Sequence, residues 1–197
     1  MTNYEMVTEK DKTNSLAFTR IGDLWYEARN YQSALDNYAR AKDADNTNPL
    51  PYKALANAYS RSGKYKLALQ NLEEYLSHSD NTNEDQLEYV RALYQAQSYC
   101  DAAKLAEKLI GSQTDAARIT ELTGILGFSQ VNCNDSMGAL TNLRKYFSMQ
   151  DPKKILPGAY LEYGKLFLKL GMLDSAGAYY TKGIEGDTTK NKSDVYR

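Results

Sequence analysis

The sequence repeats itself with a period of 34 residues. The stretch NYQSALDNYARA, residues 30–41, is matched by KYKLALQNLEEY, residues 64–75, so an aromatic residue, an alanine and a second bulky apolar residue return in the same order. The alanines continue along the chain as Ala34, Ala68, Ala102, Ala139 and Ala176, with the last two spacings lengthened to 37 residues. A fixed period of this length indicates an array of one supersecondary unit whose copies share a core. We therefore expect about five units.

Each unit is predicted to be a hairpin of two helices. Apolar residues recur at steps of three and four, the pattern of a helix with one buried face. Two helices of about 12 to 15 residues with short turns fit one period. Small residues stand where the two helices would approach most closely. These pairs are Gly22 with Ala34, Ala56 with Ala68, Gly127 with Ala139, and Gly164 with Ala176. The longer spacings, at residues 111–115 and 148–157, are expected to lengthen a joint or a first helix.

The first half of the units carries a second recurring motif, in which aromatic, apolar and small residues keep a fixed order. It is present as Phe18, Ile21, Gly22 and Trp25, as Tyr52, Leu55, Ala56 and Tyr59, and as Tyr160, Tyr163, Gly164 and Phe167. In this order of large and small positions the chain resembles the tetratricopeptide repeat (TPR) family. The resemblance implies an all-α fold, a right-handed α–α superhelix (TPR solenoid) of about five helix-turn-helix repeats.

The resemblance also implies a division of the chain. The repeats are expected at about 15–48, 49–82, 83–116, 120–153 and 157–190. Residues 1–14 are expected to be the remnant of a preceding helix or an N-terminal cap, and residues 191–197 the start of a further helix or a C-terminal tail. The chain is then part of a longer array or an array with short capping pieces of its own.

Charge and composition exclude several kinds of partner. Lys and Arg total 24 against 25 Asp and Glu, so a net charge of −1 gives no global field to attract nucleic acid. No apolar run reaches the roughly 20 residues needed to cross a bilayer, and the start MTNYEMVTEK lacks the pattern of a signal peptide. We expect no nucleic-acid partner and no membrane insertion by this segment.

The two cysteines, Cys100 and Cys133, are predicted to remain reduced. They fall in the turns of adjacent units, and stacked helices lie about 8 to 10 Å apart. That distance exceeds the limit of roughly 7 Å between Cα atoms for a disulfide.

Catalytic residues are not expected. The only histidine, His78, lies in the polar joint LSHSDNTNEDQ without a second histidine or a cysteine at ligand spacing, so a metal site is not predicted. No phosphate-binding, hydrolase or metalloprotease motif is present in the sequence. We expect a chain that is not an enzyme, with no cofactor and no metal.

The function implied by the resemblance is a protein-interaction scaffold that binds a peptide or a helix in the concave TPR groove. Inner positions of the family pattern select a candidate peptide-binding groove on this chain: Asp23, Tyr26, Lys53, Asn57, Arg61, Arg91, Tyr94, Phe128, Lys165 and Lys169. Most charges from the second unit onward are positive, which favours an extended partner segment with acidic groups and an apolar anchor. The alternative is a structural spacer or oligomerisation segment of a larger multi-domain protein.

Two narrower hypotheses were compared with the residues. The carboxylate clamp of chaperone-binding TPR proteins is matched by Lys53 and Asn57, but Glu88, Glu121 and Ile125 stand where Asn or basic residues are needed, so no clamp is assigned. The Tyr-, Asn- and Asp-rich style and the stretch YFSMQDPKKILPGAYLEYGKL resemble bacterial TPR proteins of the cell envelope. The compartment stays open, with the periplasm favoured over the cytoplasm.

Overall fold

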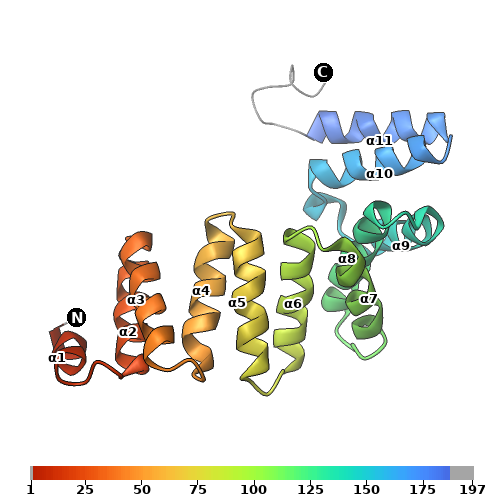
Figure 1. Ribbon diagram of the computed structural model, residues 1–197. Coiled ribbons are helices and arrows are strands. Elements are labelled where there is room, and N and C mark those ends of the chain that lie inside the picture. The colour runs from red at the N-terminus through yellow and green to blue at the C-terminus, as the bar shows by residue number, and fades with distance from the viewer. Residues whose placement is uncertain (1, 187–197) are drawn as a thin grey trace. The chain divides into compact units, whose positions relative to one another are not determined.

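The computed structural model describes residues 2–186 and contains eleven α-helices and one 3-10 helix in that range, with no strand among the described residues (Figure 1). The chain divides into two compact units, each of which spans more than one repeat: Met1–Gln97, called unit 1 from here on, and Ser98–Arg197, called unit 2. The predicted all-α class is confirmed. The expected tail at residues 191–197 and the last residues of the fifth repeat lie outside the described residues.

Unit 1 consists of six helices: α1 (Thr2–Lys10), α2 (Ser15–Glu27), α3 (Tyr31–Ala44), α4 (Pro49–Arg61), α5 (Tyr65–Ser77) and α6 (Asn83–Gln95). Helix α2 packs against α3 and α4 against α5, as the repeat predicts. Asparagine side chains cap the starts of α2, α3 and α4, because each side-chain oxygen accepts a hydrogen bond from a backbone N–H of the first turn. The caps are Asn14, Asn30 and Asn48.

Close approach between the helices of unit 1 depends on small residues. Ala34 in α3 is completely buried, in a cluster with Tyr38, Leu55 and Ala58. A side chain added at Gly22 of α2 would collide with the ring of Tyr38. The two positions therefore let α2 and α3 pack with an aromatic ring between their backbones.

Ala34→Leu is expected to lower the free energy of unfolding of unit 1 by about 1–3 kcal/mol, because three extra heavy atoms must enter a filled contact. Ala39→Leu is the matched control, since Ala39 is exposed on the same helix. Urea denaturation followed by the fluorescence of Trp25 measures both. Equal losses in the two variants would contradict the packing role of Ala34.

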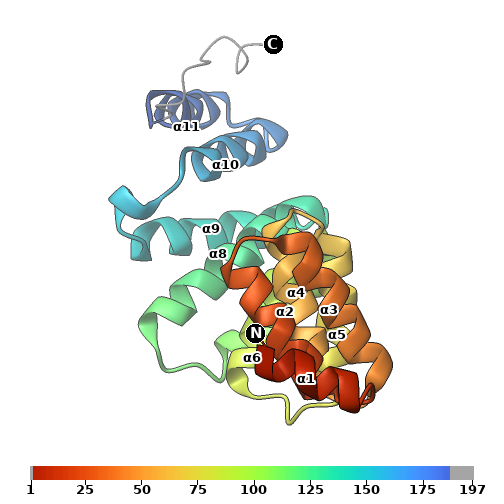
Figure 2. The ribbon, with the colours of Figure 1, turned by 90° about the vertical axis from the view of Figure 1, so that its left-hand side faces the viewer.

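Unit 2 consists of α7 (Tyr99–Ile110), α8 (Ala116–Asn132), α9 (Ser136–Met149), the 3-10 helix η1 (Pro152–Lys154), α10 (Pro157–Lys169) and α11 (Leu173–Gly186). Helix α8 packs against both α7 and α9, and α10 packs against α11, the pair seen side by side in Figure 2. The core around α9, α10 and α11 is aromatic, with Tyr163 and Phe167 buried and Phe147, Tyr179 and Tyr180 packed against them.

The longer repeat spacings have the predicted cause. Helix α8 has 17 residues, whereas α2, α4, α6 and α10 have 13 each. Helix η1 occupies the joint between α9 and α10. The boundary between the two units falls within residues 83–116, the predicted third repeat, so α6 belongs to unit 1 and α7 to unit 2. The repeat boundaries themselves remain a prediction.

The prediction that the cysteines stay reduced is wrong. Cys100 and Cys133 form a disulfide with their Cα atoms 5.5 Å apart. The prediction used the distance between helix axes, but Cα atoms lie about 2.3 Å from the axis, so facing backbones come closer than their axes do. Cys100 is the second residue of α7 and Cys133 is the C-cap of α8.

Candidate peptide-binding surface

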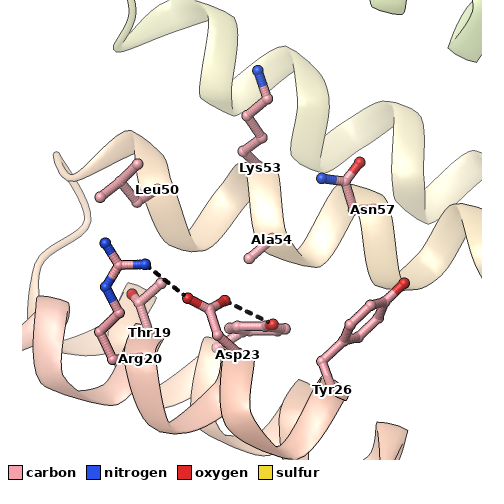
Figure 3. Close-up of a pocket in the computed structure, with 9 residues that line it drawn as sticks. Thr19, Arg20, Asp23, Tyr26, Leu50, Lys53, Ala54 and Asn57 are labelled. Atoms are coloured by element: carbon pink, nitrogen blue, oxygen red, sulfur yellow. Dashed lines mark hydrogen bonds and ion pairs between the residues drawn. The ribbon is translucent and has the colours of Figure 1, made fainter. Parts of the chain in front are cut away.

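An open hollow of about 290 Å³ lies between α2 and α4 of unit 1 (Figure 3). We call it the α2–α4 hollow, and it is lined by Thr19, Arg20, Asp23, Tyr26, Tyr38, Leu50, Lys53, Ala54 and Asn57. Four of these were predicted from the sequence: Asp23, Tyr26, Lys53 and Asn57. Leu50 and Ala54 supply apolar surface from α4, which gives the hollow room for an apolar side chain of a partner.

Asp23 is held in place by two donors. The hydroxyl of Tyr38 donates to its carboxylate at 3.0 Å, and the guanidinium of Arg20 lies 3.1 Å from the other oxygen (Figure 3). Burial, and next the negative charge of Asp23, raise the pKa of the Tyr38 phenol well above its usual range. Asp23 therefore acts mainly inside unit 1, because its charge is already compensated by Arg20.

Tyr26 closes one end of the hollow. Its ring meets the ring of Tyr31 edge to face at 5.3 Å, and the guanidinium of Arg61 lies 5.7 Å from its centroid. The Tyr26 hydroxyl is buried and has no hydrogen-bond partner among the described residues, and Figure 3 shows it directed toward α4. Tyr26 and Arg61 thus form one pair that links α2 to α4.

Lys53 does not present a free charge to the hollow, contrary to the sequence-based expectation. Its ammonium lies 2.9 Å from Asp85 and 3.5 Å from Glu88, it donates to the Tyr75 hydroxyl at 3.3 Å, and Figure 3 shows it pointing away from the hollow. Partial burial favours the neutral amine, but the hydrogen bonds to Asp85 and Tyr75 outweigh it and raise the pKa of Lys53. The ion pairs of Lys53 with Asp85 and Glu88 therefore connect α4 to α6.

Asp85 is the centre of this network. Its carboxylate accepts hydrogen bonds from the hydroxyl of Tyr75 at 2.9 Å and from the backbone and hydroxyl of Thr82, which caps α6. Burial opposes ionisation, yet the hydrogen bonds from Thr82, Lys53 and Tyr75 outweigh it and lower the pKa of Asp85 to about 2. Asp85 is thus ionised at neutral pH although it is buried.

A second hollow, of about 130 Å³, adjoins the first between α4 and α6. This α4–α6 hollow is lined by Ala56, Asn57, Ser60, Ala68, Leu72, Glu88, Arg91, Ala92 and Gln95. Asn57 lines both hollows and is exposed, and its side chain makes no hydrogen bond to any described residue. Arg61 is also exposed and has no carboxylate within ion-pair distance among the described residues. The predicted Tyr94 is half-buried on α6.

The three candidates in unit 2 are not among the residues that line these hollows. Phe128 is half-buried against the aromatic core, with its ring 5.7 Å from that of Tyr146. Lys165 is paired with Glu162 at 2.6 Å, and Lys169 donates to Asn134 at 3.2 Å. The structure therefore places five of the unit 1 candidates along the two hollows, leaves Arg61 and Tyr94 outside their lining, and gives the unit 2 candidates local partners.

Sequence reasoning missed several lining residues, among them Arg20, Leu50, Ala54, Ser60, Glu88 and Gln95. A signal was present for some of them. Arg20, Ala54 and Glu88 are spaced by 34 residues, as are Asp23, Asn57 and Arg91, so both rows occupy equivalent positions of successive repeats. Adding the position three residues before Asp23, Asn57 and Arg91 to the candidate pattern would have identified Arg20, Ala54 and Glu88.

Three further features concern metal sites and membrane spans: the position of His78, the grouping of metal-ligating side chains, and the length and hydropathy of the helices. His78 is exposed at the C-cap of α5 with its ring stacked on Tyr52, centroids 6.0 Å apart. No group of three or more His, Cys, Asp or Glu residues is arranged to hold a metal ion within the described range. Between Thr2 and Gly186, no helix is both long and apolar enough to span a membrane.

Helical hairpins that recur along the chain, with a hollowed first-helix face in unit 1, define the class: an all-α repeat protein. Comparison with solved structures gives the particular fold, that of the TPR proteins. YrrB, described as a TPR protein with an unusual peptide-binding site, superposes with a TM-score of 0.69 at 16% identity, over 96% of this chain and 94% of that one. No family model and no curated protein sequence matches the chain.

Two further structures support the same fold. MamA from Desulfovibrio magneticus RS-1 has a TM-score of 0.68 at 15% identity, over 92% of this chain and 98% of that one. PilF of Pseudomonas aeruginosa has a TM-score of 0.59 at 18% identity, over 91% and 79%. The predicted TPR fold is therefore confirmed.

Proposed function

We propose that the chain is a non-catalytic protein-interaction scaffold that binds an extended segment of a protein partner along the first-helix face of unit 1. The observation that carries this proposal is the pair of adjoining hollows that share Asn57. A side-chain amide with both donor and acceptor unused is suited to a peptide backbone, which offers one N–H and one C=O per residue. YrrB, which has the same fold and is described as having a peptide-binding site, agrees with this function.

The partner segment carries an apolar anchor and an acidic group. The anchor fits the α2–α4 hollow, where Leu50 is 46% exposed beside Ala54 and the ring of Tyr38. The acidic group meets Arg61, which lies against the Tyr26 ring and has no carboxylate within ion-pair distance among the described residues, rather than Lys53, whose charge is compensated by Asp85 and Glu88. Burial of the anchor supplies most of the affinity, and the charge orients the segment.

The test begins with peptides selected against the whole chain from a displayed random library, with Kd values measured by fluorescence anisotropy. Arg61→Glu is expected to weaken binding by about tenfold or more, because a charged hydrogen bond becomes a repulsion. Asn57→Ala is expected to weaken it about fivefold through lost backbone hydrogen bonds.

Lys66→Glu is the matched control, since Lys66 is exposed on α5 and lines neither hollow. Thermal unfolding checks that each variant is folded. If the selected peptides bind folded Arg61→Glu and Asn57→Ala as tightly as the original chain, this face is not the binding surface. The function would then be that of a spacer or oligomerisation segment.

A further inference from the structure

We propose that Cys100 and Cys133 form a redox-sensitive clamp, in which the disulfide fixes α7 on α8 and its reduction releases α7. The inference does not depend on peptide binding. The bond joins the second residue of α7 to the C-cap residue of α8, with a sequence separation of 33. It therefore closes a ring that contains both helices and the joint between them.

The fully buried side chains of α7 are mostly small. The buried residues of α7 are Ala102, Ala103, Ala106 and Leu109, three of them alanines. An alanine side chain buries little apolar area, so each contributes much less than a leucine or an aromatic residue. By contrast, α10 buries Tyr163, Leu166 and Phe167. The covalent link therefore supplements a helix contact whose fully buried side chains are small.

The ring also removes freedom from the unfolded chain. Closing a loop of about thirty residues restricts the denatured ensemble, and opening the bond returns that entropy. Cys100 lies in the first turn of α7, so opening the bond removes the covalent constraint from that end of the helix. Reduction is therefore expected to loosen α7 first.

The clamp can be reached by a reductant. Cys100 is exposed and Cys133 is half-buried, so a small thiol can attack the bond from solvent. Opening consumes two thiols, which become one disulfide, and leaves two protein thiols; closing is the reverse, with a disulfide oxidant taking up two electrons and two protons. Since disulfides persist in oxidising compartments and are reduced in the cytosol, the clamp would be closed in the first and open in the second.

The test uses the full chain with and without dithiothreitol. Thiol titration in denaturant is expected to find no free sulfhydryl before reduction and two after it. Hydrogen exchange followed by mass spectrometry is expected to show the amides of α7 exchanging at least about tenfold faster after reduction. The amides of α2 and α3 in unit 1 serve as an internal control and are expected to be unchanged.

The Cys100→Ser/Cys133→Ser double variant separates the bond from other effects of the reductant. It is expected to exchange at α7 as the reduced chain does, and to be insensitive to dithiothreitol. Two free thiols in the unreduced chain would overturn the proposal. So would equal protection of α7 in the oxidised and reduced chains.

Discussion

Replacing Tyr163 by alanine is expected to lower the free energy of unfolding of unit 2 by about 3–5 kcal/mol. Tyr163 is 1% exposed in α10. Its ring centroid lies 4.7 Å from that of Phe147, and 4.6 Å from those of Phe167 and Tyr179. Truncation removes the ring that these three share, and the resulting cavity cannot collapse without moving α9, α10 and α11 together.

Two control variants separate the effect of losing the Tyr163 ring from two others: the loss of its hydroxyl, and the truncation of an exposed side chain on the same helix. Tyr163→Phe keeps the ring, so its cost is expected to stay below about 1.5 kcal/mol. Leu168→Ala removes a side chain that is 52% exposed on the same helix, and is expected to cost much less than Tyr163→Ala. Urea denaturation followed by circular dichroism measures the three. The aromatic-core description fails if Tyr163→Ala costs no more than Leu168→Ala.

Unit 1 is expected to lose stability in acid through Asp85. The pKa of Asp85 is lowered from 3.8 to about 2 in the folded chain, because Thr82, Lys53 and Tyr75 favour its charged form against the effect of burial. The folded chain thus binds this proton less readily than the unfolded chain. The stabilisation is complete above about pH 4, amounts to roughly 2 kcal/mol, and is lost as the pH falls toward 2.

Asp85→Asn isolates this contribution. The gap in free energy of unfolding between the original chain and Asp85→Asn is expected to be about 2 kcal/mol at pH 7 and to narrow steadily between pH 4 and pH 2.5. Asp36→Asn, at an exposed position on α3, is expected to show little gap at any pH. A gap for Asp85→Asn that is the same at pH 7 and pH 2.5 would show that the carboxylate charge does not stabilise the fold.

Local patterns in the sequence predicted the helices well because they act over one or two turns. Asn48 followed by Pro49 is a helix start, and α4 begins at Pro49. A glycine between two helical patterns indicates a turn, and Gly63 and Gly171 lie in the turns before α5 and α11, where both adopt positive φ. The small positions Gly22 and Ala34 identified the close helix contact, because only side-chain size decides how near two backbones come.

The interactions that sequence reasoning missed depend on distance in space rather than in sequence. Lys53 and Asp85 lie 32 residues apart, and their pairing requires the orientation of α4 against α6. The disulfide depends on the ends of two helices, where an average spacing between axes is misleading. The charge that the groove offers to a partner therefore could not be predicted from the groove residues alone. Lys53 and Lys165 are each paired with a nearby carboxylate, and the repeat pattern does not reveal these ion pairs.

The division into two compact units makes the choice of spectroscopic probe decisive. The chain has a single tryptophan, Trp25, which packs against the core cluster of unit 1. Its fluorescence follows that unit alone, whereas the disulfide and most of the aromatic stacking belong to unit 2. Repeat proteins unfold by parts when neighbouring parts differ in stability, so the two units are expected to give separate transitions. Tryptophan emission would then remain native while reduction of the disulfide loosens the other half of the chain.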